Sequence, residues 1–330
     1  MTKQPTVLDV ARVARVGAST VSRFLRGVPV RREAAERISA AVQKLGYTPD
    51  ETARALRGGR SRTIGLVLPK ISNAFFSEAT QYMEEEARKQ GCSVILLIHQ
   101  DYPEQQLEHL QTLRRYRADG VILTAAPGSS LQDIRQVLPG TPLVAFDSFF
   151  SREVDSVLLR NREAARIATE HLLSHGYRRI LCVGAKPDTY SFRERVTGYI
   201  EAMEATRAKP EALVPNDYEQ LRYLLGSAIR GKHAPDAILS LSDFATLHTL
   251  TAFGELGLEP EKWYPMVSFD EFGYAPLMSP PLTVVRQPVE KMARYALNTL
   301  FHRIQDNEPQ EVQQIMLPGE LVRRRSCGCV

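Results

Sequence analysis

Three aspartates stand where apolar, strand-like stretches of the sequence end. Asp147 and Asp270 end such stretches, and Asp243 comes just after another. Ligands of open parallel sheets sit at the carboxyl ends of strands, where carboxylates accept hydrogen bonds from hydroxyl groups. A strand-end aspartate also serves as a helix cap or a loop residue. The sequence leaves both interpretations open for each of the three.

Two histidines have the spacing of metal ligands. His171 and His175 are four residues apart, which places them on one face of a helix, but no third ligand is evident. The C-terminal segment 327–329 reads Cys-Gly-Cys, which allows a disulfide or a metal clip. Frayed thiols are the simpler interpretation, so we expect no metal and no other cofactor.

The sequence lacks the G-x-G-x-x-G, P-loop, H-E-x-x-H and G-x-S-x-G motifs, so we expect no catalytic residues and no enzyme. Its 330 residues predict two or three domains. Four cysteines are too few for a disulfide framework, and no apolar stretch approaches the length of a membrane span. The N-terminus has no signal core. We therefore expect a cytoplasmic protein without membrane contact.

The charge is unevenly distributed along the chain. Residues 1–62 contain 13 Lys and Arg against 5 Asp and Glu, a net charge of +8. The remaining 268 residues carry a net charge of −4. A small basic segment on a mildly acidic body indicates a polyanionic partner for the basic segment alone.

The basic segment is expected to form three short helices. Thr6 and Asp9 have the spacing of a capping box at the start of the first helix, which Gly17 ends. The second helix covers about 18–25, and the third runs from about 32 to 45, where Gly46 caps it. Two short helices with a tight turn, packed on a third, form a helix-turn-helix. A purely structural three-helix bundle is the alternative.

Ten segments carry a specific resemblance: 7–11 (VLDVA), 20–23 (TVSR), 45–49 (LGYTP), 53–57 (ARALR), 63–69 (TIGLVLP), 71–76 (ISNAFF), 117–122 (RADGVI), 195–199 (RVTGY), 268–270 (SFD) and 282–288 (LTVVRQP). Their order and spacing over nearly the whole chain resemble the LacI/GalR family of transcription repressors. The chain departs from that family at Arg15, where a glycine is usual, and at Gly17, where a serine cap is usual. The loop 27–33 is one residue short, and the third helix lacks its usual serine cap.

The resemblance implies that the second helix enters the major groove of DNA. Arg23 is then the best base reader, with Ser19 and Ala18 beside it. The candidates for contact with the DNA backbone are Thr6, Thr20, Ser22 and Arg26. The resemblance also implies a hinge helix over 50–57 that inserts Leu56 into the minor groove, with Arg54 and Arg57 beside it. An ordinary buried leucine is the alternative for Leu56.

From residue 63 onward, apolar strands alternate with helix-length stretches, which predicts parallel α/β sheets. The predicted strands are 64–68, 93–98, 120–123, 143–146, 156–159, 180–183, 237–241, 264–269 and 283–285. We therefore predict a helix-turn-helix domain over 1–48, a hinge and linker over 49–62, and a body over 63–330. The resemblance implies that the body has two lobes of the periplasmic-binding-protein type, with crossings near 161, 287 and 318.

The resemblance also indicates which residues face the cleft between the lobes. Phe75 and Phe76 match an aromatic wall, Arg195 matches a cleft arginine, and Ser191 lies nearby. Arg160 stands where the family commonly has an aspartate. Two arginines facing one ligand favour an acidic effector, a sugar acid or a sugar phosphate, over a neutral sugar. A solvent-facing Arg160 is the alternative.

We therefore expect a ligand-responsive repressor of genes for carbohydrate or sugar-acid metabolism. It binds a pseudo-palindromic operator in double-stranded DNA as a homodimer and is switched by a sugar, sugar acid or sugar phosphate in the cleft. A sugar-active enzyme on the same α/β body is one alternative, which the +8 basic segment disfavours. A solute-binding module for transport is another, and the absence of a signal peptide disfavours it.

Overall fold

The computed structural model describes residues 5–25, 28–47, 60–184, 188–215, 217–259, 263–305 and 311–329. The chain divides into two compact units, Met1–Ser61 and Arg62–Val330, which we call the head and the body and describe separately. The predicted hinge helix, with Arg54, Leu56 and Arg57, lies outside the described residues, as does Arg26.

The head consists of α1 (Val7–Ala14), α2 (Ala18–Leu25) and α3 (Arg32–Leu45). The predicted capping box is confirmed, because Thr6 accepts from the backbone of Asp9 and the Asp9 carboxylate accepts from that of Thr6. Arg15 ends α1 in the left-handed conformation, with φ 52°, where the family's glycine would meet no strain. No side chain caps the start of α3, as the missing serine predicted. The three helices enclose a core around Val10, Val21 and Ile38.

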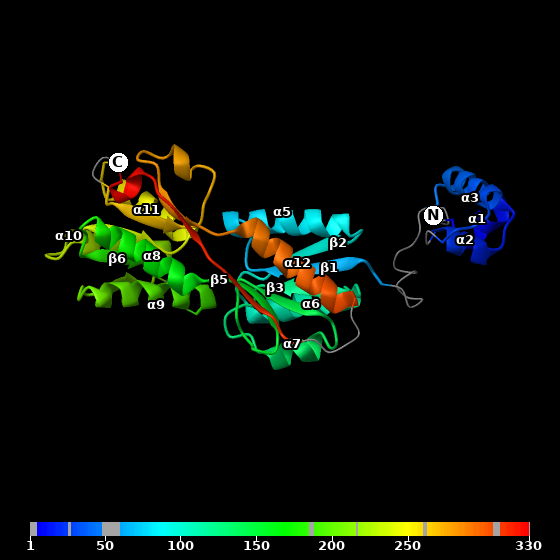
Figure 1. The fold of residues 1–330 in the computed structure, drawn as a ribbon, viewed down its shortest axis with the longest axis horizontal. Coiled ribbons are helices and arrows are strands. Elements are labelled where there is room, and N and C mark those ends of the chain that lie inside the picture. Colours follow the sequence, from blue (N-terminus) through cyan, green and yellow to red (C-terminus); the bar gives the residue numbers. More distant parts are fainter. Residues whose placement is uncertain are drawn as a thin grey trace. The chain divides into compact units, whose positions relative to one another are not determined.

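The first lobe of the body, the N-lobe, is a sheet with strand order β11-β5-β4-β3-β1-β2. Its strands are β1 (Thr63–Leu68), β2 (Ser93–Ile98), β3 (Gly120–Leu123), β4 (Leu143–Phe146), β5 (Asp155–Leu159) and β11 (Gln314–Leu317). Four helices cover it: α5 (Ala74–Lys89), α6 (Pro103–Arg115), α7 (Leu131–Val137) and α12 (Val289–Gln305). The core that includes α5 and α12 is separate from the core that includes α6 and α7, so the helices lie on both faces (Figure 1).

The second lobe, the C-lobe, repeats this plan with strand order β12-β10-β9-β8-β6-β7. Its strands are β6 (Ile180–Val183), β7 (Glu211–Leu213), β8 (Ala237–Ser240), β9 (Met266–Phe269), β10 (Thr283–Arg286) and β12 (Glu320–Val322). Its helices are α8 (Asn161–Ser174), α9 (Tyr190–Ala205), α10 (Tyr218–Arg230), α11 (Asp243–Glu255), η2 (Ala275–Leu277) and η3 (Arg325–Cys327). The core beside α8 and α9 is again separate from the core beside α10 and α11.

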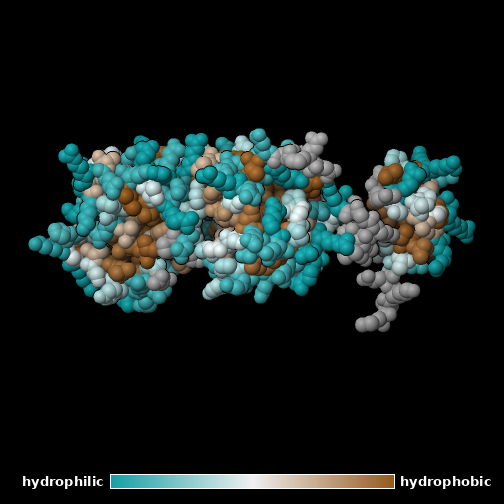
Figure 2. Space-filling model, turned by 90° about the horizontal axis from the view of Figure 1, so that it is seen from below, coloured by the Kyte–Doolittle hydropathy of each residue, from teal (hydrophilic) through white to brown (hydrophobic). Residues whose placement is uncertain are grey.

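The chain passes between the two sheets at three places: between β5 and α8, between β10 and α12, and between β11 and β12. The described strand pairs are parallel except for β10 and β12, which pair antiparallel. The predicted two-lobed α/β body with parallel sheets is confirmed. Figure 2 shows a largely hydrophilic surface on the body, with hydrophobic patches on both lobes. Among the described helices, none combines the length and the hydrophobicity that crossing a membrane requires.

Candidate functional site

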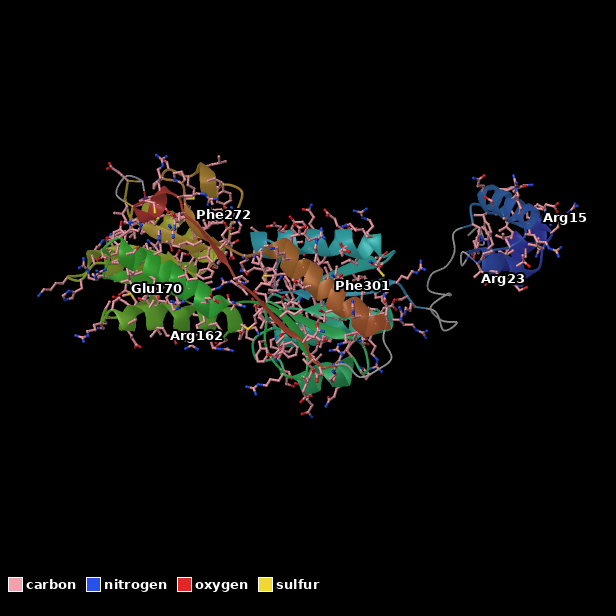
Figure 3. All side chains as sticks on the ribbon, viewed as in Figure 1. Arg15, Arg23, Arg162, Glu170, Phe272 and Phe301 are labelled. Atoms are coloured by element: carbon pink, nitrogen blue, oxygen red, sulfur yellow. The ribbon has the colours of Figure 1, made fainter. Side chains whose placement is uncertain are left out.

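The head presents polar side chains on one side of α2. Ser19 and Arg23 are exposed and lie one helical turn apart, while Val21 between them is buried. Ala18, Thr20 and Ser22 are half-buried. Figure 3 shows Arg15 and Arg23 extending outward from the helices. The hydroxyl of Thr6 lies 2.7 Å from the Asp9 carboxylate, so its first role is in the cap.

A cavity of about 140 Å³ lies in the cleft between the two lobes of the body. Six of the eight predicted cleft residues line it: Phe75, Phe76, Asp147, Ser191, Arg195 and Asp270. Phe75 stacks on Phe146 with ring centroids 5.5 Å apart and meets Phe76 edge to face. The N-lobe therefore supplies an aromatic wall, and the C-lobe supplies polar groups opposite it.

Asp147 and Asp270 occupy equivalent positions in the two lobes, directly after β4 and β9. Both have positive φ, 50° and 74°, and both donate their backbone N–H to the neighbouring strand, to Val157 and Val285. The carboxylate of Asp270 accepts from the amide of Gln287 at 2.6 Å. By contrast, Oδ1 of Asp147 is buried and has no hydrogen-bond partner among the described residues.

The two carboxyl groups therefore differ in their electrostatics. Burial raises the pKa of Asp147 to about 7; the Arg195 guanidinium opposes this rise, and the charge of Asp270 adds to it. A carboxyl group with this pKa is partly protonated near neutral pH, so it can donate or accept a hydrogen bond. The cavity thus offers a ligand one carboxyl group that can donate or accept, and a second, that of Asp270, which the amide of Gln287 holds in place.

Arg195 is the buried cation of the cavity. Its Nε donates to Asn161 at 2.7 Å and its Nη1 donates to the carbonyl of Leu241 at 2.6 Å. Its guanidinium also stacks over the ring of Phe269, 4.3 Å from the centroid. These contacts fix the side chain on three sides at the wall of the cavity.

Asp243 does not line the cavity; it joins the two lobes at the edge of the cleft. Asn73 of the N-lobe donates its side-chain amide to Asp243 at 2.5 Å, and the backbone N–H of Ala74 donates to it at 3.2 Å. Lys70 of the N-lobe lies over the ring of Phe244 of the C-lobe, 4.3 Å from its centroid. These contacts hold the lobes together around the cavity.

The structure corrects the expectation that Arg160 faces the cleft. Arg160 follows β5 and donates its backbone N–H to Leu317, while its half-exposed side chain pairs with Glu163 at 3.5 Å. It borders a different surface depression, beside the first turn of α8. The argument for an acidic effector depended on two arginines in the cleft, so it loses its basis.

Sequence reasoning missed Asn73 and Asn161, which hold Asp243 and Arg195. Both stand at the start of a helix that follows a strand, which was the available signal. Asn73 also accepts from the backbone N–H of Phe76, so it caps α5. Cap positions beside strand ends are natural places for groups that reach into a cleft.

Two family models account for nearly the whole chain. The model for periplasmic binding proteins and the sugar binding domain of the LacI family matches residues 61–322, and that for bacterial regulatory proteins of the lacI family matches residues 6–50. The chain belongs to the LacI family. It is accordingly a DNA-binding transcriptional repressor, and the prediction of a regulator rather than an enzyme is confirmed.

Individual LacI-family proteins are similar to this chain along its whole length. The transcriptional repressor PurR of Actinobacillus pleuropneumoniae is 28% identical over 330 residues, which cover 97% of this chain and 98% of that protein. The ribose operon repressor of Halalkalibacterium halodurans is 29% identical, covering 97% and 96%. A crystal structure of the lac repressor dimer bound to operator and an anti-inducer has a TM-score of 0.86 and 22% identity, covering 98% and 99%. That likeness shows the fold.

Proposed function

We propose that this chain represses transcription as a dimer on operator DNA and that a small polyhydroxylated molecule in the cleft changes its affinity for DNA. The observation that carries the proposal is the cavity, whose lining combines the aromatic rings of Phe75 and Phe76 with Asp147, Asp270 and Arg195. Such a combination suits a sugar ring and its hydroxyl groups. The ribose operon repressor, similar along its length, supports a carbohydrate class.

The charges of the cavity favour a neutral ligand. Its lining includes the acidic residues Asp101, Asp147 and Asp270 and the basic residues Lys70 and Arg195. Two buried carboxyl groups, of which Asp147 is only partly protonated near neutral pH, disfavour a phosphate or carboxylate, and the contacts of Arg195 already engage much of its guanidinium. We infer a neutral sugar or a related polyol rather than a sugar acid or a sugar phosphate.

On DNA, we propose that α2 lies in the major groove with Arg23 as the base reader and Ser19 and Ala18 beside it. Thr20, Ser22 and Arg26 then contact phosphates, and the end of α1 capped by Thr6 approaches the backbone. We further propose that residues 50–57 form a hinge helix whose Leu56 enters the minor groove between Arg54 and Arg57. Domain limits of 1–48, 49–62 and 63–330 follow from this assignment.

Dimerisation has support from the surface of the C-lobe. Leu277, the last residue of η2, is 81% exposed, and Tyr274, just before η2, is 53% exposed. Such apolar exposure is typical of an interface. The lac repressor structure with similar fold contains a dimer on operator, and we propose the same assembly here.

A repressor that acts on chromosomal operators works in the cytoplasm, and we propose that location.

The DNA-binding proposal is tested with a duplex selected from random sequences. Fluorescence anisotropy should give a log–log salt dependence with a slope of about −5 to −9, because each subunit neutralises about three to five phosphates. Arg23→Ala should weaken binding to the selected duplex about 10- to 100-fold, and Leu56→Ala should weaken it more than it weakens binding to random DNA. Arg152→Ala, an exposed site in the body, is the charge-matched control. A slope shallower than about −2 contradicts the proposal.

The ligand proposal is tested by calorimetry with matched pairs, such as glucose against gluconate and ribose against ribose 5-phosphate. A neutral member of a pair should bind, and its charged partner should bind at least ten-fold more weakly. Tight binding of the charged partner alone would contradict a neutral ligand while leaving DNA binding untouched.

A further inference from the structure

Four side chains that could ligate a metal meet in the C-lobe, away from the cavity. The Nε2 atom of His171 lies 3.2 Å from the Sγ atom of Cys327 and 3.6 Å from that of Cys329. The Nε2 atom of His175 lies 3.3 Å from the Sγ atom of Cys329, and the two sulfurs are 3.4 Å apart. All four ligand atoms lie within 4.8 Å of one another.

Four of the six separations between these atoms are close to the edges of a tetrahedral zinc site. Zinc binds cysteine sulfur at about 2.3 Å and histidine nitrogen at about 2.0–2.1 Å. A tetrahedron with those bond lengths has edges of about 3.3–3.8 Å between its ligand atoms. Four of the six separations between the ligand atoms are 3.2 to 3.6 Å, and all six are within 4.8 Å, so small side-chain adjustments would bring all four atoms to bonding distance from one ion.

The topology explains why residues so distant in sequence meet here. Helix α8 starts at the crossing between the lobes and ends at Ser174, remote from the cleft, and His175 is its C-cap residue. Strand β12 enters the C-lobe from another crossing and runs antiparallel to β10, so it also leads away from the cleft. The far ends of both elements meet, and the terminal Cys-Gly-Cys segment lies against the last turn of α8.

The protein scaffold holds the cysteine segment in place by itself. Ser326 donates its hydroxyl to the carbonyl of Met266 at 2.7 Å and accepts from the backbone of Thr283 at 2.8 Å. Gly328 has φ 92°, and a Cβ atom there would lie 2.7 Å from the hydroxyl of Tyr177. Glycine at this position therefore allows the tight turn that directs both sulfurs to one point.

We propose that His171, His175, Cys327 and Cys329 bind one Zn²⁺ ion, which fastens the C-terminal segment to α8. Two thiolates and two neutral imidazoles balance the charge of the ion and form a Cys₂His₂ set. All four positions belong to the protein, so the site is structural and leaves no position for a substrate. The hydroxyl of Thr283, 3.1 Å from the sulfur of Cys327, supports that ligand from outside the tetrahedron.

From the sequence we expected no bound metal, and this inference revises that expectation. The histidine pair was visible at i and i+4, but its partners lie about 150 residues further along the chain. Only the packing of η3 against the end of α8 brings the second pair of ligands into reach.

The test begins with the metal content of the full chain, purified without a metal-affinity tag and under reducing conditions. Elemental analysis should find about one zinc per chain in the wild type. Cys329→Ser and His175→Ala should each lose it, and both sites are at least partly exposed, so the variants should fold. Cys92→Ser and His302→Ala, a half-buried cysteine and an exposed histidine outside the cluster, should retain it.

A second measurement defines the coordination. Co²⁺ added to the metal-free wild type should give the visible d–d and thiolate charge-transfer absorption of a tetrahedral site, and His175→Ala should alter that spectrum. Equimolar Zn²⁺ should raise the Tm of the metal-free wild type and leave that of Cys329→Ser unchanged. Zinc content that both cluster variants retain, or a Cys327–Cys329 disulfide in place of bound zinc, would overturn the proposal.

Discussion

The two lobes of the body share one strand order but differ in what they bring to the cleft. Strands β4 and β9 are equivalent, and each is followed by an aspartate with positive φ. Asp270 is held by Gln287, whereas Oδ1 of Asp147 has no hydrogen-bond partner among the described residues. The repeated scaffold therefore fixes where a carboxyl group stands, and its surroundings decide which hydrogen bonds it makes.

The last strands of the two sheets, β11 and β12, run in different directions relative to their neighbours, and the position of the cleft explains why. Strand β11 is parallel to β5, so the chain leaves it at the cleft, where the carboxyl ends of the strands lie. The chain then enters the C-lobe from the cleft, and β12 must run antiparallel to β10. This reversal takes the C-terminus to the end of α8, where the histidine and cysteine cluster lies.

Replacing Arg195, the buried cation of the cavity, should have the largest effect on ligand binding. Arg195→Met removes the donors to Asn161 and Leu241, and leaving such buried acceptors unpaired costs about 1–3 kcal/mol of unfolding free energy. Ligand affinity should fall at least 100-fold in calorimetry, because the variant loses the buried guanidinium that lines the cavity from the C-lobe. Arg193→Met, on an exposed position of the same helix, should bind normally.

The contrast between the two aspartates predicts opposite responses to amide substitution. The pKa of Asp147 is about 7 in the folded chain against 3.8 for a free side chain, so the folded state binds the proton more tightly. Stability should therefore fall as pH rises from about 4 to 7. Asp147→Asn removes this loss of stability. At pH 8 its free energy of unfolding should exceed that of the wild type by on the order of 2–4 kcal/mol, and near pH 4 there should be no such gain.

Asp270→Asn is the matched comparison, measured in the same urea titrations. It should destabilise the chain by about 1–3 kcal/mol at pH 8, because the substitution replaces the buried group that accepts from the Gln287 amide. If both amide variants changed stability in the same direction, the electrostatic difference between the lobes would be refuted.

Removing the contact between the lobes should have a smaller effect on ligand affinity. Asn73→Ala removes the bond to Asp243 and the cap of α5, so the open form gains population and ligand affinity should fall a few-fold. Ser130→Ala removes the cap of α7, where Ser130 accepts from the backbone of Asp133, without touching the other lobe. Both variants should lose about 1 kcal/mol of stability, but only Asn73→Ala should bind ligand more weakly.

Arg160→Ala should have the smallest effect of all. Its pair with Glu163 is half exposed, and such pairs contribute about 0.2–1 kcal/mol. Ligand affinity should stay within two-fold of the wild type in the same calorimetric titration. A larger loss would mean that Arg160 reaches the cleft after all.

The sequence predicted the central strands and the edge strand β2 well, and the other edges of the sheets poorly. The strands β1 and β9 are strongly apolar because helices cover both their faces. The strands β7, β11 and β12 were missed; each is short, with exposed residues at an edge of its sheet, so its pattern resembles that of a loop. Family resemblance indicated Arg195 and the phenylalanines, but the orientation of Arg160 depends on a single step of strand alternation.

Asn73 has a consequence for how long a ligand stays bound. Opening the cleft breaks its bond to Asp243 and also the bond from the backbone of Ala74. Both bonds must be lost before the lobes separate, whether or not they touch the ligand. They therefore raise the barrier to escape and slow the exchange of effector, so the repressor responds to a sustained supply of its ligand and not to a brief fluctuation.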